Sequence, residues 1–299
     1  MIIDFHTHTF PDRIAGAAVK ELSETAHIVA HLDATNDALT ASMEQCGIDL
    51  SIVLPVVTSP RQVEKINDTA VRVNEAYAAG EDSSDISGPG AGRRKGRLIS
   101  FGGIHPDYEG YKAELSRMKG NGLKGVKLHP VYQGADIDDI RFLRIMDRAA
   151  EVGLIVITHG GLDIGFPGKD NCSPKKIRHV VDELGDFPFV AAHMGGWREW
   201  EDVLRYLAET KVYLDTSFST EEIEPLSDGY WDGQDLSMLS GEDFVSMVRA
   251  FGAERILFGT DSPWTDQGRA LSYMKQLPLT EEERTAILGG NGMRLLGIL

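Results

Sequence analysis

The sequence predicts an α/β fold, a (β/α)8 TIM barrel that forms a single domain over residues 1–299. Short apolar runs rich in β-branched residues recur eight times, and each is followed by a stretch with helical spacing, which is the alternation of parallel βα units. The length suits one barrel built around one core. An open doubly wound sheet shows the same alternation, but it usually has a glycine-rich phosphate turn after an early strand, and this sequence has none there.

The strands are predicted from the apolar runs and the helices from the periodic stretches between them. The predicted strands span residues 2–6, 50–56, 98–104, 125–129, 154–158, 189–193, 212–216 and 256–260. The predicted helices include 60–79, 138–152, 174–184 and 280–289. Ser173 is the expected N-cap of the helix over 174–184, with Pro174 at its first position and Gly185 as its stop. Thr280 and Glu283 have capping-box spacing, which predicts a final helix that closes the barrel.

Two segments interrupt this alternation. Residues 80–96 are rich in Gly and Ser and lack apolar periodicity, so we interpret them as a flexible surface insertion. Residues 218–239 follow the seventh strand, where barrel loops face the active site. Tyr230 and Trp231 make this segment a candidate lid loop, although a solvated acidic loop with two anchoring aromatic side chains fits the same residues.

The composition limits the partners of the chain. Lys and Arg number 30 and Asp and Glu 46, so the formal net charge is −16, which repels nucleic-acid phosphates and anionic membranes. Cys46 and Cys172 show neither disulfide nor zinc-thiolate spacing. The N-terminal residues lack signal-peptide features, and no segment is a long apolar span. We therefore expect a cytoplasmic protein that binds a small-molecule substrate, not nucleic acid or membrane; a homo-oligomer stays open.

Histidines collect at the ends of the predicted strands. His6 and His8 are two residues apart and share a face, as a chelate requires, but this spacing alone is a weak signal. The third to sixth strands are each ended or followed by a histidine, and the eighth is followed by a carboxylate: His105, His129, His159, His193 and Asp261. Barrel active sites lie at this face, so the convergence predicts a metal site. These ligand types suit one Zn²⁺, with Mn²⁺, Fe²⁺ and Co²⁺ as rivals.

Four motifs in this order resemble the amidohydrolase superfamily: HTH on the first strand, ITHGG on the fifth, AHMGG on the sixth and GTDSP on the eighth. They look most like the branch that contains aminocarboxymuconate-semialdehyde decarboxylase and related hydrolases. The resemblance implies that the metal ligands are His6, His8, His159 and Asp261. It also implies that His193 is a catalytic acid/base or polarises the substrate, and that Asp261 accepts the proton of the metal-bound water.

The fourth strand, GVKLHP, allows two interpretations. Binuclear members of the superfamily carry a carboxylated lysine on this strand, which would place Lys127 in a second metal site. We favour one metal and a structural Lys127, with Asp4, two residues before His6 on the same face, as its charge partner. Asp215, at the end of the seventh strand, either orients a ligand histidine or accepts backbone amides.

Further side chains near the strand ends are candidates for substrate binding: His105, His129, Lys127, Trp197 and Trp264. The two histidines either line the pocket or hold a loop, and the two tryptophans either form apolar pocket walls or pack between helices. Lys127 and Arg198 would suit a carboxylate on the substrate.

The leading hypothesis is a metal-dependent hydrolase, in which a metal-activated water attacks the amide, ester or lactone carbonyl of a small substrate. Asp261 would handle the proton, and His193 would stabilise the oxyanion or protonate the leaving group. The alternative is non-oxidative, metal-dependent decarboxylation, a carbon–carbon lyase reaction in the same site. A third hypothesis is a barrel that retains its metal and only binds a ligand.

Overall fold

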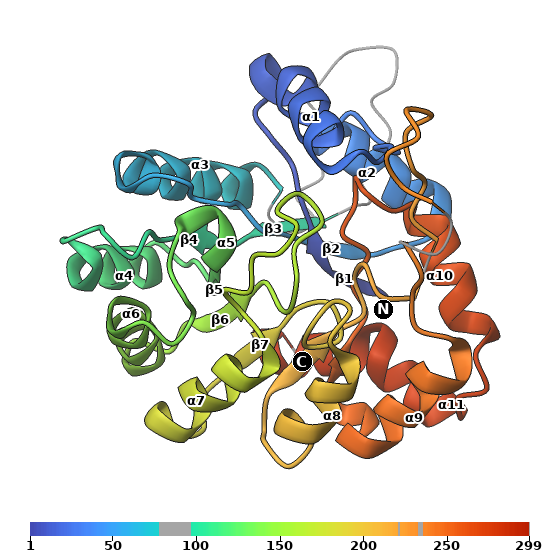
Figure 1. Ribbon diagram of the computed structural model, residues 1–299. Helices are drawn as coiled ribbons and strands as arrows, with labels where there is room; N and C mark the ends of the chain where they lie inside the picture. Colours follow the sequence, from blue (N-terminus) through green and yellow to red (C-terminus); the bar gives the residue numbers. More distant parts are fainter. Residues whose placement is uncertain (78–96, 221, 233–235, 299) are drawn as a thin grey trace.

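The computed structural model describes residues 1–77, 97–220, 222–232 and 236–298, and it confirms the predicted (β/α)8 barrel. The parallel strands lie at the centre and the helices surround them (Figure 1). The segment 80–96, which was predicted to be an insertion, lies outside the described residues.

Every strand pair is parallel and follows chain order. The strands are β1 (Ile3–Thr7), β2 (Leu50–Val53), β3 (Arg97–Ser100), β4 (Gly102–Gly103), β5 (Gly125–Leu128), β6 (Ile155–Thr158), β7 (Phe189–Ala191), β8 (Tyr213–Asp215) and β9 (Ile256–Leu257). They form two sheets, β1-β2-β3 and β4-β5-β6-β7-β8-β9. At the outer edges, Phe5 N donates a hydrogen bond of 2.7 Å to Phe258 O. The first and last strands are therefore neighbours, as in a barrel.

The predicted third strand, 98–104, is interrupted at Phe101, so this part of the prediction was wrong. The reason lies in the helix α3 (Val63–Ala76), whose asparagine side chains take over backbone hydrogen bonds of the strand. Asn74 bonds the N–H and the C=O of Ser100 at 2.6 and 3.1 Å, and Asn67 accepts a bond from Gly103 N at 2.8 Å. Phe101 N still donates to Val53 O of β2 at 2.9 Å, which keeps β3 and β4 in one strand position.

The helices lie outside the strands. They are α1 (Asp12–Ala26), α2 (Asn36–Cys46), α3, α4 (Tyr111–Gly120), α5 (Pro130–Gln133), α6 (Ile140–Glu151), α7 (Pro174–Leu184), α8 (Trp200–Leu207), α9 (Gly241–Phe251), α10 (Gln267–Gln276), α11 (Glu281–Thr285) and α12 (Asn291–Leu296). Single turns of 3-10 helix cover Pro60–Gln62 and Ala253–Arg255, and a π-helical turn covers Ala286–Gly290. None of the helices within the described residues is long and apolar enough to cross a bilayer.

The predicted helix ends are confirmed in part. The predicted bounds of α7 agree with the structure, and Gly185 ends it with a φ of 72°. Ser173 is the N-cap and Pro174 begins the helix, as predicted, although the Ser173 side chain makes no capping hydrogen bond. Thr280 and Glu283 form the predicted capping box. The helix that they begin ends earlier than expected, because a π-helical turn separates α11 from α12.

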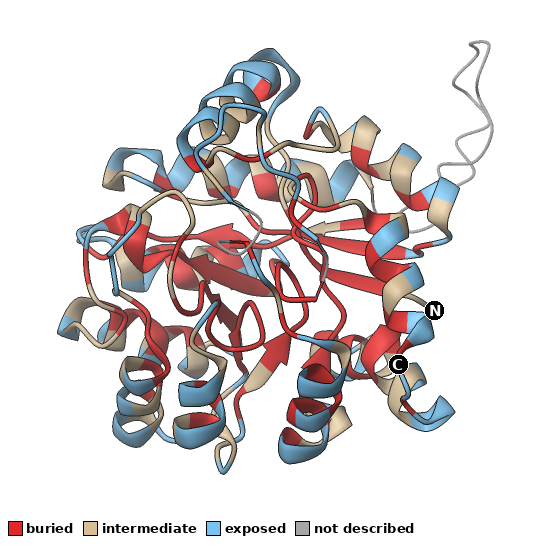
Figure 2. Ribbon diagram, turned by 45° about the vertical axis from the view of Figure 1, so that its right-hand side comes forward, coloured by how far each residue is buried: buried red, intermediate tan, exposed pale blue. Residues whose placement is uncertain are grey.

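Two apolar layers hold the barrel together. One fills the interior below the site and includes Phe5, Ile52, Phe101 and Ile157. The larger layer packs the outer faces of the strands against the helices, so that the strands are buried on both faces (Figure 2). Phe5 and Phe101 meet edge to face with ring centroids 6.1 Å apart, a favourable aromatic geometry that closes the floor beneath the site.

A bulge in β1 decides which side chains reach the site. The pairing with β2 shifts register between Asp4 and Thr7, and such a bulge turns one side chain away from strict alternation. Asp4 contacts the outer helix α10, where it accepts a hydrogen bond of 2.7 Å from Gln267, while His6 turns into the barrel mouth. Asp4 is therefore bonded to the outer layer, and the expectation that it pairs with Lys127 was wrong.

Candidate active site

A cavity of about 190 Å³ opens at the carboxyl ends of the strands. Its lining contains almost every residue that the sequence singled out: His6, His8, Lys127, His129, His159, His193, Trp197, Asp261 and Trp264. His105 does not line this cavity; its Nδ1 accepts a bond of 3.1 Å from Asp107 N. Arg198 lies over the Trp197 ring at 5.7 Å and is also outside the lining.

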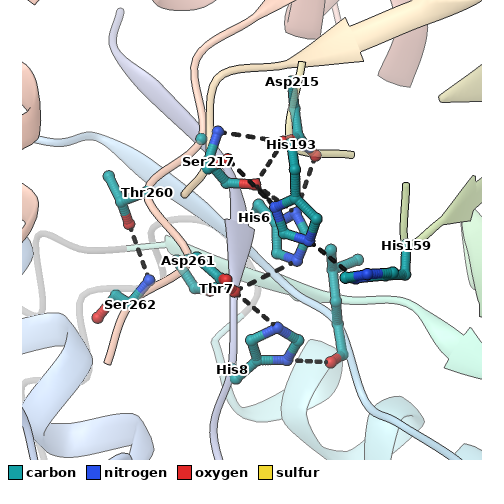
Figure 3. A network of polar contacts seen from close by, with 12 residues as sticks. His6, Thr7, His8, His159, His193, Asp215, Ser217, Thr260, Asp261 and Ser262 are labelled. Atoms are coloured by element: carbon teal, nitrogen blue, oxygen red, sulfur yellow. Dashed lines mark hydrogen bonds and ion pairs between the residues drawn. The ribbon is translucent and has the colours of Figure 1, made fainter. Parts of the chain in front are cut away.

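Three of the four predicted metal ligands form a compact group, which we call the His6–His8–Asp261 group; one potential ligand atom from each lies within 4.8 Å of the others. Asp261 Oδ1 is 3.0 Å from His8 Nε2 and 3.5 Å from His6 Nε2 (Figure 3). Among the described residues this buried oxygen has no hydrogen-bond donor. A carboxylate oxygen between two imidazoles is a ligand arrangement that suits a divalent cation.

The proton positions on the two histidines strengthen this fit. His8 Nδ1 lies 2.7 Å from the carbonyl of Leu54, and His6 Nδ1 lies 2.8 Å from Asp215 Oδ2. Because both oxygens only accept, each Nδ1 carries a ring proton, which in a neutral ring leaves the lone pair on Nε2. His8 Nε2 faces Asp261 Oδ1 at 3.0 Å. Histidines that ligate metals commonly donate their other N–H in this way.

His159 and His193 show the same pattern beside this group. His193 Nδ1 lies 3.1 Å from Ser217 O, and His159 Nε2 lies 3.0 Å from Leu162 O. Their other nitrogens face each other at 3.0 Å. His159, the fourth predicted ligand, therefore turns its unprotonated Nδ1 toward His193 and lies outside the His6–His8–Asp261 group.

Asp215 orients the surrounding residues, and both alternatives given for it hold at once. Its Oδ2 accepts from His6, while its Oδ1 accepts backbone bonds of 3.1 Å from His193 N and Ser217 N. Ser217 Oγ also donates to Asp215 Oδ1 and lies 3.0 Å from the Nδ1 atoms of both His6 and His193 (Figure 3). Sequence reasoning missed Ser217; its place two residues after Asp215, directly beyond the strand, was the available signal.

Strained backbone places two of these side chains. His193 and Asp261 have φ values of 60° and 62°, in the left-handed region that residues other than glycine rarely adopt. Alternation along β7 would turn His193 outward, and this conformation turns its ring toward His6, with centroids 5.2 Å apart. Such outliers cluster at functional sites, where the surrounding structure holds them in place.

The electrostatics keep His6, His159 and His193 neutral and Asp261 ionised. Burial, aided by Lys127, lowers the pKa of His6 to about 4, and burial also lowers the pKa of His159 and His193. Burial acts against the charge of Asp261, but His6 and His8 outweigh it and hold the pKa of that carboxyl well below its usual range.

Lys127 lies at the base of the cavity and is 1 % exposed. Its Nζ is 3.3 Å from His6 Nε2, so the amine contacts the unprotonated nitrogen of a candidate ligand. Burial lowers the pKa of Lys127 to about 8, although Asp215 and Asp261 favour its charged form. These two carboxylates, rather than Asp4, are the charge partners of this lysine.

A second polar group lies across the mouth, where β5 and β6 end. One potential ligand atom each from His129, His159 and Asp163 lies within 4.8 Å of the others, and the rings of His129 and His159 stack with centroids 4.5 Å apart. Sequence reasoning missed Asp163, although its position in the glycine-flanked segment GGLDIG after β6 marks a polar residue at the mouth.

The outer cavity is mainly apolar, with Leu22, Ile28, Trp197, Phe218 and Trp264 in its lining. The aromatic residues of the candidate lid loop contact α1 instead. Trp231 Nε1 donates to Ala26 O at 2.8 Å, and Tyr230 stacks on His27 with centroids 3.8 Å apart. Of the described residues of 218–239, Phe218 lines the cavity, and Tyr230 and Trp231 anchor the loop beside it.

The chain is thus a parallel α/β barrel with histidines and an aspartate at its mouth. Comparison of its sequence with family models identifies the family. The Amidohydrolase family model matches residues 3–298, so the chain belongs to that family. No curated protein matches the chain.

Several solved structures share the fold over almost the whole chain. A TIM-barrel protein from Bordetella bronchiseptica is 19 % identical, with a TM-score of 0.69 and coverage of 99 % of this chain and 98 % of its own. A manganese-bound dihydroxybenzoic acid decarboxylase from Polaromonas is 14 % identical, with a TM-score of 0.64 and coverage of 99 % and 97 %. A probable 2-pyrone-4,6-dicarboxylic acid hydrolase from Acinetobacter baumannii is 15 % identical, with a TM-score of 0.61 and coverage of 99 % of both.

Proposed function

We propose that this protein is a metal-dependent hydrolase that acts on the amide, ester or lactone carbonyl of a small substrate. The observation that carries the proposal is the His6–His8–Asp261 group, in which two imidazole nitrogens converge in one cavity on a carboxylate oxygen that has no hydrogen-bond donor among the described residues. His6, His8 and Asp261 would hold the ion, with Zn²⁺ as the proposed metal and His159 as the fourth ligand. A bound divalent ion supplies an acidified water and polarises a carbonyl.

The residues of the chain would carry the proton transfers. Asp261 accepts the proton that leaves the attacking water, because its carboxyl is ionised. His193 keeps its Nδ1 proton on Ser217 O, so its Nε2 takes over the proton held by Asp261 and donates it to the leaving atom. The C–N or C–O bond breaks, the leaving atom takes up that proton, and one water is consumed.

Decarboxylation in the same site is the second candidate, and the apolar outer cavity is the observation that favours it. A carboxylate held beside Trp197, Phe218 and Trp264 loses hydration, which favours a reaction that disperses its charge. The proton that replaces CO₂ on carbon would come from His193. A dihydroxybenzoic acid decarboxylase has the same barrel fold, so the fold is compatible with this reaction.

The test uses the zinc-reconstituted protein with a panel of aryl amides, esters and lactones and, in parallel, CO₂ release from aryl carboxylates. We expect hydrolysis, and we expect Asp261→Asn to lose both turnover and bound metal while Asp202→Asn, an exposed change on α8, keeps both. CO₂ release without hydrolysis would replace the proposal with the second candidate. Stoichiometric metal with no turnover of any panel member would contradict both and favour a ligand-binding barrel.

A further inference from the structure

The His129–Asp163 pair across the mouth is a polar site that the proposed chemistry does not use, and we call it the His129–Asp163 pole. Both residues are 8 % exposed and both line the cavity. Asp163 Oδ1 accepts a bond of 2.8 Å from Gly165 N, whereas Oδ2 lies 3.6 Å from His129 Nε2, too far for a hydrogen bond. Within the described part of the chain, His129 Nδ1 has no hydrogen-bond partner at all.

A metal ion does not suit the pole. His159 is the third member of that group, but its Nε2 points at Leu162 O and therefore carries the ring proton. Its only lone pair, on Nδ1, is turned toward His193. Two donor atoms, from His129 and Asp163, then remain, fewer than the three or four protein ligands of a typical zinc site.

Counting donors and acceptors shows what the pole can bind. Asp163 Oδ2 is a carboxylate oxygen, which only accepts, and His129 Nε2 lies 3.6 Å from it, beyond hydrogen-bond distance. His129 Nδ1 has no hydrogen-bond partner among the described residues. The pole therefore holds a carboxylate acceptor that needs a donor, and a buried acceptor without a donor is costly. A ligand that presents an O–H or N–H satisfies it, and a ligand that presents a carboxylate does not.

The position of the pole sets the shape of that ligand. The His6–His8–Asp261 group comes from β1 and the segment after β9, whereas the pole comes from the ends of β5 and β6, on the other side of the ring of strands (Figure 1). Apolar and aromatic walls, including Trp197, Phe218 and Trp264, lie in the lining of the same cavity. A substrate that reaches both sides needs an apolar body with its two polar ends apart.

The loop that carries Asp163 is held rigidly. Leu162 N donates to Trp197 O at 3.2 Å, and Trp197 N donates to Gly160 O at 2.9 Å, so the loop is bonded to the one that follows β7. Tyr132 closes the other side, edge-on to His129 with centroids 4.6 Å apart. A preorganised acceptor of this kind discriminates strongly between ligands with and without the matching donor.

We propose that the His129–Asp163 pole is a specificity site for a hydroxyl or amino group at the end of the substrate remote from the scissile carbonyl. This inference rests on the proposed function and names its substrate class: ring-sized apolar esters, amides or lactones with a distal hydrogen-bond donor. It replaces the expectation of a carboxylate-bearing substrate, because among the described residues no arginine lines the cavity, and Lys127 lies against His6 rather than at the pole.

The test measures binding separately from turnover, with ketones that the enzyme cannot hydrolyse. Acetophenone, 3- and 4-hydroxyacetophenone and 4-acetylbenzoate are titrated calorimetrically into the zinc-loaded protein. Of the two hydroxyacetophenones, the one that binds more tightly should exceed acetophenone in affinity by on the order of tenfold, because it gains one hydrogen bond to a charged acceptor. The affinity of 4-acetylbenzoate should be no higher than that of acetophenone.

The variant Asp163→Asn keeps an acceptor for Gly165 N but loses the carboxylate charge. It should reduce the hydroxyl preference to within about twofold and leave acetophenone binding unchanged, whereas Asp202→Asn should keep the preference. His129→Asn, expected to weaken the same preference, replaces it if Asp163→Asn does not fold. Absence of binding, a preference for the carboxylate, or a hydroxyl preference that survives in the variants would overturn the proposal. Hydrolysis of the matching methyl esters tests the proposed function separately.

Discussion

The two sides of the cavity differ in how their imidazoles are held. On the side of β1 and β9, the Nδ1 atoms of His6 and His8 lie 2.8 and 2.7 Å from a carboxylate and a carbonyl oxygen, and their Nε2 atoms converge on Asp261 Oδ1. On the side of β5, His129 has an Nδ1 without a partner among the described residues, and its Nε2 is 3.6 Å from Asp163. Imidazoles whose N–H groups are bound to protein oxygens can turn their other nitrogens toward a cation. Acceptors that lack a protein donor can instead bind a ligand that donates hydrogen bonds.

The largest effect should separate the two sides directly. His8→Asn removes a nitrogen that faces Asp261 Oδ1, so the affinity for Zn²⁺ should fall by more than about 100-fold, beyond the usual loss for residues that only support a ligand. His129→Asn should change that affinity little. Competition with a chelating dye measures both constants, and equal losses in the two variants would abolish the distinction.

The second effect concerns the loop beneath Asp163. Gly161 has a φ of 79°, and a Cβ there would overlap the backbone of Gly196 and Trp197. Gly161→Ala should therefore lower the free energy of unfolding by about 2–3 kcal/mol, because strain and overlap add. Gly16→Ala on α1, where nothing lies within 4 Å, should instead raise that energy by up to about 1 kcal/mol.

Urea unfolding monitored by circular dichroism measures both changes. In Gly161→Ala, the affinity for zinc should stay closer to the wild-type value than the affinity for the hydroxyketones does, because the altered loop carries Asp163. Stability equal to that of the wild type would mean that the loop is not held as described.

These contrasts also show where sequence reasoning succeeds. His6, His8, His159, His193 and Asp261 were found because strand ends of a parallel barrel meet at one face, and the structure places all five in one cavity. The partner of Lys127 was not found, because the β1 bulge breaks the alternation that linked Asp4 to His6. Asp163 and Ser217 were missed because their roles depend on loop conformation, which has no periodic pattern.

The third prediction tests the proton on His6. In Asp215→Asn the amide keeps an oxygen for the backbone N–H groups of His193 and Ser217, and its NH₂ then faces His6 Nδ1. That nitrogen must accept rather than donate, so the ring proton moves to Nε2 and the lone pair toward the cavity is lost. We expect a 10- to 100-fold loss of zinc affinity with little change in the unfolding midpoint. An unchanged affinity would mean that the tautomer of His6 does not matter.

The smallest effect distinguishes the essential acceptors from the redundant one. Ser217→Ala removes an oxygen that lies 3.0 Å from the Nδ1 atoms of both His6 and His193. Each proton nevertheless keeps an acceptor, Asp215 Oδ2 for His6 and the Ser217 carbonyl for His193. The zinc affinity should therefore fall by no more than about fivefold, the worth of one ordinary hydrogen bond. If Ser217→Ala lowered the zinc affinity as much as Asp215→Asn does, a general loss of packing rather than a fixed tautomer would explain both losses. The contrast between the two sides of the cavity would then lose its physical basis.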